Sequence, residues 1–113
     1  MVKQAPGTLY PLAALRAVVL HAQRLTVPND ASPPPTPDAI VDLVRALGYV
    51  QIDTIHVVKR AHYVALWARF GAYETDALDA LLYTAGQRRL YEGWGHAASI
   101  IPLDHYRYHR WRT

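Results

Sequence analysis

The sequence predicts a single, mainly α domain with a small β component. Apolar residues recur at helical spacing over most of the chain, and only two short stretches, residues 49–53 and 90–101, alternate with the period of a strand. At 113 residues, 51% of them hydrophobic, the chain can build one modest core and is too short for two. We therefore treat residues 1–113 as one unit.

The first half of the chain predicts two helices separated by a loop. Residues 12–25 place apolar side chains at helical spacing and form an amphipathic helix. Residues 27–37 are rich in proline, which lacks a backbone donor, so we expect a loop there. Residues 37–47 carry the clearest helix signals, with Thr36 as N-cap, a proline in the first position and Gly48 just past the end.

The second half adds the strands and further helices. A short strand is expected over about 49–53, helices over about 58–70 and 75–84, and a hairpin over 90–101. Residues 102–113 then begin a helix that the end of the sequence cuts short. Helices, one short strand, more helices and a late hairpin follow the order of a winged helix-turn-helix, in which the hairpin is the wing.

Composition excludes several classes of protein. The absence of cysteine removes disulfides, thiolate metal sites and a cysteine nucleophile. No apolar run approaches the roughly 18 residues of a membrane span, and the first ten residues lack the apolar core of a signal peptide. We therefore expect a cytoplasmic protein that has no contact with a membrane.

The C-terminal segment is basic and aromatic. Residues 88–113 hold five arginines against two acids, with tyrosines and tryptophans between them. This composition suits a polyanion whose bases can stack, and it makes Arg88 and Arg89 candidates for phosphate contacts in DNA. A solvated amphipathic segment is an equally simple interpretation.

The most specific local pattern is Gln51-Ile52-Asp53. A strand places Gln51 and Asp53 on one face about 6.5–7 Å apart, where an amide and a carboxylate can hold one water or substrate group. Ile52 faces the core. The pattern taken alone fits two polar residues on the solvated side of a strand better than a catalytic pair.

Other chemistries find little support. His105 and His109 have helical ligand spacing, but no third ligand completes a metal site, so we expect no metal and no cofactor. No serine elbow or glycine-rich phosphate loop is present. By composition, we expect Trp67, Tyr73 and Trp94 to lie in the core.

Four motifs in order resemble one family. The run from Gly48 to His62, which contains Gln51 and Asp53, resembles the signature of the AlkZ and YcaQ-like winged-helix DNA glycosylases of bacteria. Members of that group unhook interstrand crosslinks and remove bulky alkylated bases. The segments 15–25, 66–73 and 89–99 agree in order and spacing, so the resemblance covers nearly the whole chain from about Pro11.

The resemblance implies an N-terminal unit of a tandem winged-helix architecture. Members of the family extend over several hundred residues, so we expect this chain to be too short for activity alone, with the missing C-terminal units as partners beside DNA. The resemblance makes Gln51 and Asp53 the catalytic pair for hydrolysis of the N-glycosidic bond of an alkylated purine. Asp53 would polarise water and offset the positive charge at C1′, while Gln51 orients the water or sugar.

The resemblance also names supporting residues. It includes three candidates for DNA contacts, which are Arg60, His62 and Arg69. It also includes three candidates for bracing the site, which are Gln23, Glu92 and His96. For Arg60 and Arg69 a phosphate contact and a structural ion pair remain equally open.

One departure from the family pattern and one alternative function stand beside this interpretation. Gly93 stands where the family commonly has an aromatic residue, and we expect the glycine to loosen the strand.

The alternative function is a non-catalytic winged-helix DNA-binding module that reads DNA through a protruding helix. A catalytic site requires Gln51 and Asp53 on an exposed concave surface beside arginines, so the placement of these side chains separates the two.

Overall fold

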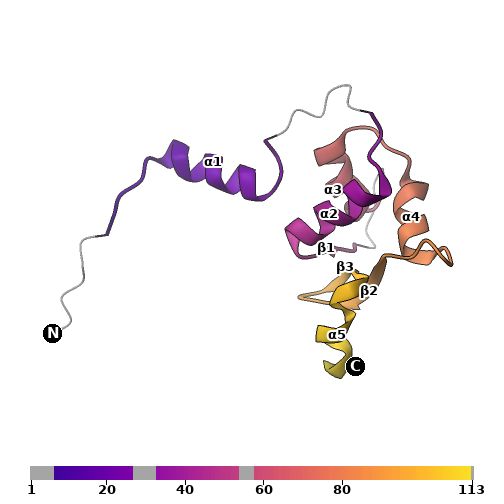
Figure 1. Ribbon diagram of the computed structural model, residues 1–113. Helices are drawn as coiled ribbons and strands as arrows, with labels where there is room; N and C mark the ends of the chain where they lie inside the picture. The colour runs from indigo at the N-terminus through magenta and orange to yellow at the C-terminus, as the bar shows by residue number, and fades with distance from the viewer. Residues whose placement is uncertain (1–6, 27–32, 54–57, 113) are drawn as a thin grey trace.

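The computed structural model describes residues 7–26, 33–53 and 58–112 and shows a mainly helical domain with a small antiparallel sheet (Figure 1). This agrees with the predicted fold class. The helices longer than four residues are α1 (Leu12–Ala22), α2 (Pro37–Leu47), α3 (Ala61–Phe70) and α4 (Thr75–Tyr83). The strands are β1 (Val50–Gln51), β2 (Leu90–Trp94) and β3 (Ala98–Pro102), and the last turns are η1 (Leu103–His105), α5 (Tyr106–His109) and η2 (Arg110–Arg112).

Helix α2 has the predicted bounds. The Thr36 hydroxyl accepts a hydrogen bond from the Ala39 amide at 3.2 Å, and Gly48 ends the helix with φ of 87°. The left-handed conformation of Gly48 is one that residues with a Cβ rarely adopt. One face of α2 is buried in the core through Ile40, Val41, Leu43 and Val44. Local capping signals therefore define this helix, and its apolar stripe anchors it.

The sheet has the strand order β1-β3-β2 and is antiparallel throughout. Val50 pairs with Ile100 and Gln51 with Ser99, so the central strand is β3. Strand β1 has two residues, which is shorter than predicted, and the Ile52 amide makes a last bond to the Ala98 carbonyl at 2.8 Å. β1 ends there because β3 itself begins at Ala98 and offers no further partner.

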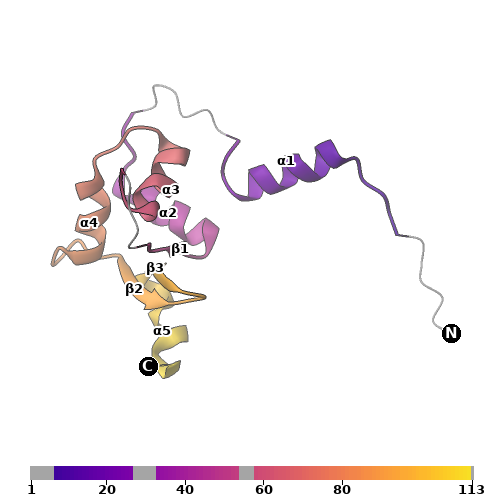
Figure 2. The same cartoon turned by 180° about the vertical axis from the view of Figure 1, so that it is seen from behind.

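The core fills the space between the sheet and α2, α3 and α4, and α5 lies on the opposite side of the sheet (Figure 1 and Figure 2). The sheet and the helices α2, α3 and α4 each contribute side chains that are fully or almost fully buried. The fully buried members of the cluster are Ile40, Val44, Leu66, Leu78, Leu90 and Ile100. The three helices and the hairpin are thus held by one shared apolar cluster.

Several predicted boundaries shift. Helix α3 begins at Ala61 and not near 58, because Arg60 is extended with ψ of 145°. Helix α3 ends at Phe70, before Gly71, as its predicted range implies, and α4 ends at Tyr83, one residue earlier than predicted. The predicted last helix is a series of three short turns. Most of the predicted proline-rich loop lies outside the described residues.

Helix α1 stands apart from the rest of the molecule (Figure 1 and Figure 2). None of its residues is buried, although its apolar side chains follow the predicted helical spacing. The radius of gyration is 17.5 Å, against about 13 Å for a compact chain of this length. Among the described residues, no helix combines the length and the apolar character needed to cross a membrane.

The prediction that the large aromatic residues lie in the core is wrong for both tryptophans that it names. Trp67 is 53% exposed and Trp94 is 70% exposed, whereas Tyr73 is half-buried and donates to the Tyr63 carbonyl. Trp67 follows the buried Leu66 and is turned by about 100° from it around α3. Size and apolar character alone do not say which face of an element a residue occupies.

Candidate functional site

Gln51 lies at an open hollow of about 320 Å³ beside β1. The hollow is lined by Gln23, Leu47, Tyr49, Val50, Gln51, Ala65 and Arg69. Gln51 is exposed while its neighbour Val50 is 5% exposed and packs in the core, as strand alternation predicts. The amide of Gln51 is therefore presented to solvent from a fixed strand.

Arg69 gives the hollow a fixed positive charge. Its Nη1 donates to the Ala65 carbonyl at 2.8 Å, and its Nε donates to the Gln23 carbonyl at 2.9 Å. Burial lowers the pKa of Arg69 from its ordinary value, yet a guanidinium remains charged in proteins. Both interactions are with backbone oxygens, and Arg69 forms no ion pair within the described residues, so its charge remains available for an anion.

Gln23 reaches the hollow from the end of α1. Its backbone carbonyl accepts the bond from Arg69, and the residue is one of those that line the hollow. This is the point where α1 meets α3, and it brings one predicted bracing residue next to Gln51. The sequence alone does not show that these residues are neighbours, because Gln23, Gln51 and Arg69 come from three different elements.

Asp53 follows β1 and is half-buried. It shares the alternation of Gln51 along the chain, but it is not one of the residues that line the 320 Å³ hollow. The predicted pair is therefore divided between the hollow, which holds Gln51, and the segment that leaves it, which carries Asp53.

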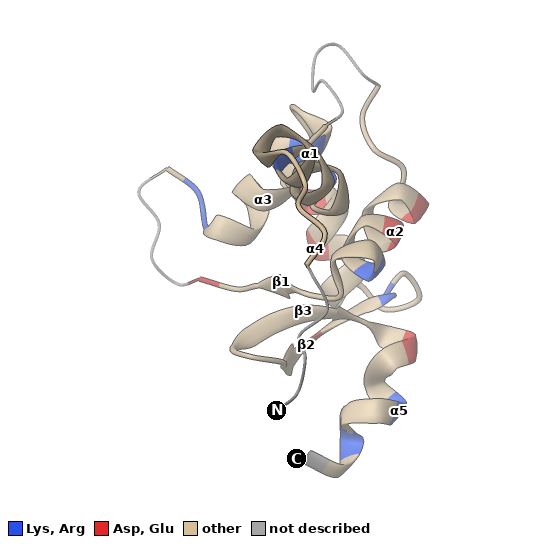
Figure 3. Ribbon diagram, turned by 90° about the vertical axis from the view of Figure 1, so that its left-hand side faces the viewer, with Lys and Arg blue, Asp and Glu red and all other residues tan. Residues whose placement is uncertain are grey.

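The other DNA-contact candidates before and within α3 differ in exposure. Arg60 is exposed at the start of α3, in a segment that Figure 3 shows to be basic. His62 is 5% exposed, and burial, followed by the charge of Arg60, lowers its pKa below the ordinary value of 6.5. His62 therefore lies beneath the surface as a neutral imidazole at neutral pH, and Arg60 lies on it.

Arg88 and Arg89 lie away from the Gln51 hollow. Arg89 forms an ion pair with Asp38 of α2. Arg88 is exposed and lines two other hollows, one of which it shares with Arg89 and Arg45. Arg45 is itself paired with Asp104 at 3.1 Å, so much of the positive charge in this region is already matched.

Glu92 and His96 belong to the hairpin. Glu92 accepts a hydrogen bond from the Tyr83 hydroxyl, and burial together with this carboxylate raises the pKa of Tyr83 to about 12. The contact joins α4 to β2. His96 is exposed in the turn between β2 and β3. Neither residue lines the Gln51 hollow.

Helix α4 is acidic. It carries Asp76 and Asp79 and has no lysine or arginine, and Asp79 accepts a hydrogen bond from the Tyr63 hydroxyl at 2.7 Å.

Within residues 7–26, 33–53 and 58–112, no group of three or more histidines or acids is arranged to hold a metal ion.

The family model of AlkZ-like DNA glycosylases matches residues 44–113. The match covers more than half of the chain and includes β1, α3, α4 and the hairpin, so this chain belongs to the AlkZ-like DNA glycosylase family. The predicted family is thereby confirmed, and with it a role in DNA repair with DNA as substrate or partner. No solved structure matches the chain.

Sequence reasoning missed Tyr49 as a lining residue and the contact between Arg69 and the end of α1. Tyr49 carried a usable signal, because it shares the strand face of Gln51. The contact of Arg69 depends on how α3 packs, and no local pattern in the sequence encodes it.

Proposed function

We propose that this chain provides the catalytic hollow of a DNA glycosylase that hydrolyses the N-glycosidic bond of alkylated or crosslinked purines. The observation that carries the proposal is the exposed Gln51 amide beside the half-buried Arg69 cation in one open hollow. The hollow supplies a concave, arginine-bearing surface for Gln51, while Asp53 lies on the segment that leaves the hollow. The family membership supports a glycosylase-related role.

The topology supports a winged-helix unit as the scaffold. From α2 onward the order is helix, strand, two helices and a hairpin, and the sheet order β1-β3-β2 places the first strand beside the last. In such a unit the hairpin of β2 and β3 is the wing. We propose that this unit is one part of a tandem arrangement whose other units supply further contacts with DNA.

The chemistry assigns different tasks to the two polar residues. An N7-alkylated guanine is cationic and is already a good leaving group, so the enzyme must supply water and stabilise the sugar cation. The Asp53 carboxylate polarises the water and offsets the charge that develops at C1′. The Gln51 amide orients that water or the sugar by hydrogen bonds.

Arg69 binds a phosphate in this mechanism. A fixed guanidinium close to a developing oxocarbenium ion raises the barrier, whereas the same group on a DNA phosphate holds the strand in register. Its two backbone bonds fix its position, so the phosphate is located relative to Gln51.

The open shape of the hollow fits large lesions. Extrusion of a bulky or crosslinked base into a closed pocket is costly, because stacking and pairing are lost and the base must fit. An exposed glutamine in a shallow hollow reaches the glycosidic bond without that step. The substrate class we infer is therefore a bulky N-alkylated purine still attached to its DNA.

The non-catalytic binding module is less well supported. In a winged-helix module of that kind the helix before the wing enters the groove, and here that helix is α4. Its two aspartates and lack of basic residues oppose approach to phosphates. The charge of α4 thus argues against groove reading and leaves the Gln51 hollow as the better candidate.

The test is single-turnover release of 7-methylguanine from methylated duplex DNA by the complete polypeptide that carries these residues. We expect Gln51→Ala to slow release by roughly tenfold, since an orienting hydrogen bond is partly replaced by water. Gln87→Ala, which changes an exposed glutamine in the turn after α4, is the matched control and should leave the rate unchanged.

Two results contradict the proposal. The first is binding of methylated DNA without release of any free base at large enzyme excess. The second is equal loss of rate in Gln51→Ala and Gln87→Ala, which would mean that the hollow has no special role. Either result returns the protein to the class of DNA-binding modules.

A further inference from the structure

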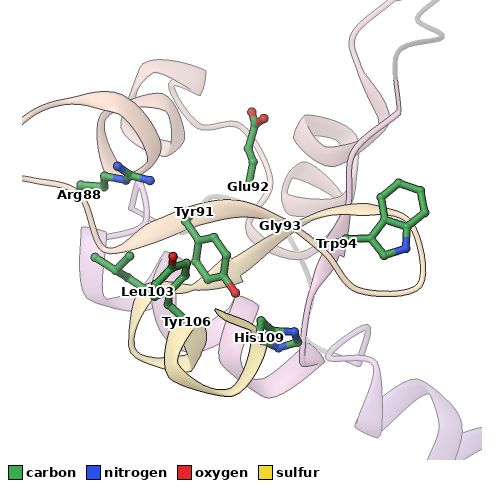
Figure 4. Close-up of a pocket in the computed structure, with 8 residues that line it drawn as sticks. All are labelled: Arg88, Tyr91, Glu92, Gly93, Trp94, Leu103, Tyr106 and His109. Atoms are coloured by element: carbon green, nitrogen blue, oxygen red, sulfur yellow. The ribbon is translucent and has the colours of Figure 1, made fainter. Parts of the chain in front are cut away.

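A second hollow, of about 480 Å³, lies between β2 and α5 (Figure 4). It is lined by Arg88, Tyr91, Glu92, Gly93, Trp94, Leu103, Tyr106 and His109. Its walls are largely aromatic, and Tyr91 meets Tyr106 edge to face with ring centroids 5.5 Å apart. The volume lies within the range of small-molecule sites in proteins.

Two polar atoms at this hollow are buried without a hydrogen-bond partner. They are the hydroxyl oxygen of Tyr91 and Nδ1 of His109, and Tyr91 as a whole is 6% exposed. Figure 4 shows both side chains on the α5 side of β2. Buried polar atoms are almost always paired in folded proteins, so two such atoms at one hollow indicate a site that a ligand completes.

Gly93 permits this arrangement. A Cβ at residue 93 would lie 2.6 Å from Cε2 of the Tyr91 ring, which is closer than carbon atoms approach each other. The glycine therefore lets the Tyr91 ring lie along the strand toward α5. Gly93 still pairs with Ser99, so the expected loosening does not remove it from the ladder. Burial raises the pKa of Tyr91, so its hydroxyl stays protonated and can donate.

We propose that this hollow binds one unpaired, unmodified nucleobase of the DNA, with Arg88 on an adjacent phosphate. A nucleobase is flat and aromatic, and its edge carries donors and acceptors for Tyr91 and His109. The ring of Tyr106, which meets Tyr91 edge to face, offers a stacking surface, whereas the Trp94 ring lies with Glu92 on the opposite face of β2 (Figure 4). Arg88 is exposed at the same hollow and has no hydrogen-bond or ion-pair partner among the described residues, which suits a phosphate.

The turn of the hairpin connects this hollow with the Gln51 hollow. Trp94 precedes Gly95, and a Cβ on Gly95 would lie 3.8 Å from the ring of Tyr49, which lines the Gln51 hollow. Release of the damaged base at Gln51 leaves its opposite base without a partner, and that base is the one we assign to the second hollow. This source of the base rests on the proposed function.

The experiment measures binding of two labelled pentadeoxynucleotides by fluorescence anisotropy, one with a central adenine and one with an abasic residue there. Both carry the same phosphates and neither carries an alkylated base, so the result does not depend on glycosylase activity. Because stacking of one base contributes about 1–3 kcal/mol, we expect the unmodified protein to bind the adenine form roughly tenfold more tightly.

Three variants test the assignment. Tyr91→Phe removes only the partnerless hydroxyl, so it should fold like the unmodified protein by circular dichroism and reduce the tenfold preference to about threefold or less. His109→Ala should reduce the preference similarly. Tyr108→Phe is the matched control, because Tyr108 is exposed on the same turn and does not line the hollow.

Equal binding of the adenine and abasic forms by the unmodified protein overturns the inference, because binding would then depend on phosphate charge alone. An unchanged preference in both Tyr91→Phe and His109→Ala also overturns it. Base release from methylated DNA together with either result would leave the proposed function intact.

Discussion

Helices α1 and α2 have the same length of 11 residues and opposite environments. Four residues of α2 are buried, whereas no residue of α1 is buried. Helix α1 is the more apolar of the two, since Arg16 and His21 are its only polar residues, while α2 carries Asp38, Asp42 and Arg45 on its outer face. Apolar content alone therefore does not bury a helix.

The difference shows what secures a helix in this molecule. The apolar stripe of α2 faces the sheet and α4, its Thr36 cap fixes its start, and Arg89 and Arg45 pair with its acids. Helix α1 begins after Pro11 without a side-chain cap and meets the rest of the described chain through the carbonyl of Gln23. An isolated helix of this length is marginal in water.

The largest effect we expect is on stability, from truncating one apolar side chain in each helix. Ile40→Ala leaves a cavity in the core and should reduce the free energy of unfolding by about 2–5 kcal/mol. Leu15→Ala on α1 should change it by less than about 0.5 kcal/mol, because Leu15 is already half-exposed. Urea denaturation of both variants measures the difference, and equal losses would show that α1 is packed in solution.

Removing the cap of α2 should have a smaller effect. Thr36→Ala takes away the acceptor of the Ala39 amide and should lower the free energy of unfolding by about 1 kcal/mol. The same change at Thr84, which follows α4 and is exposed, is the control and should be nearly neutral. A loss at Thr84 as large as that at Thr36 would mean that the hydroxyl bond does not secure α2.

The smallest effect should come from lowering the pH, and it concerns the packed region through His62. Its pKa is lowered in the folded protein, so as the pH falls below about 6.5 the unfolded chain takes up the proton first. Above that pH the neutral His62 therefore makes its full contribution to the free energy of unfolding. This contribution declines as the pH falls below that value. His62→Phe, followed by thermal unfolding between pH 7.5 and 5, should flatten the decline, and an unchanged profile would exclude His62 as its cause.

The sequence predicts this molecule best where local chemistry decides. The bounds of α2 follow from Thr36, Pro37 and Gly48, whose effects depend only on their neighbours in the chain. The length of β1 was overestimated, because a strand ends where its partner ends and β3 lies almost fifty residues away. The alternation of apolar and polar residues correctly predicted that Gln51 is exposed and that Val50 is buried.

The two hollows illustrate what sequence reasoning leaves out. Arg69 was a candidate for DNA contact, but its position next to Gln51 depends on the packing of α3 against β1. The sequence shows Tyr91 only as one of several aromatic residues in the basic C-terminal segment, because the lack of a partner for its hydroxyl depends on the packing around it. From the sequence, Gly93 was expected only to loosen the strand. In the structure the Tyr91 ring occupies the space where a Cβ of residue 93 would lie.

The most direct test of the central claim is the rate of base release by Asp53→Asn in single-turnover reactions on methylated DNA, with the complete polypeptide. The change is isosteric and should preserve the fold and the affinity for DNA, yet it removes the charge that stabilises the sugar cation. We expect release to slow by roughly a hundredfold to a thousandfold, or about 2.7–4 kcal/mol of barrier. Asp76→Asn on the exposed face of α4 should leave the rate unchanged. An Asp53→Asn protein that releases 7-methylguanine as fast as the unmodified protein would contradict the claim that this carboxylate carries the reaction.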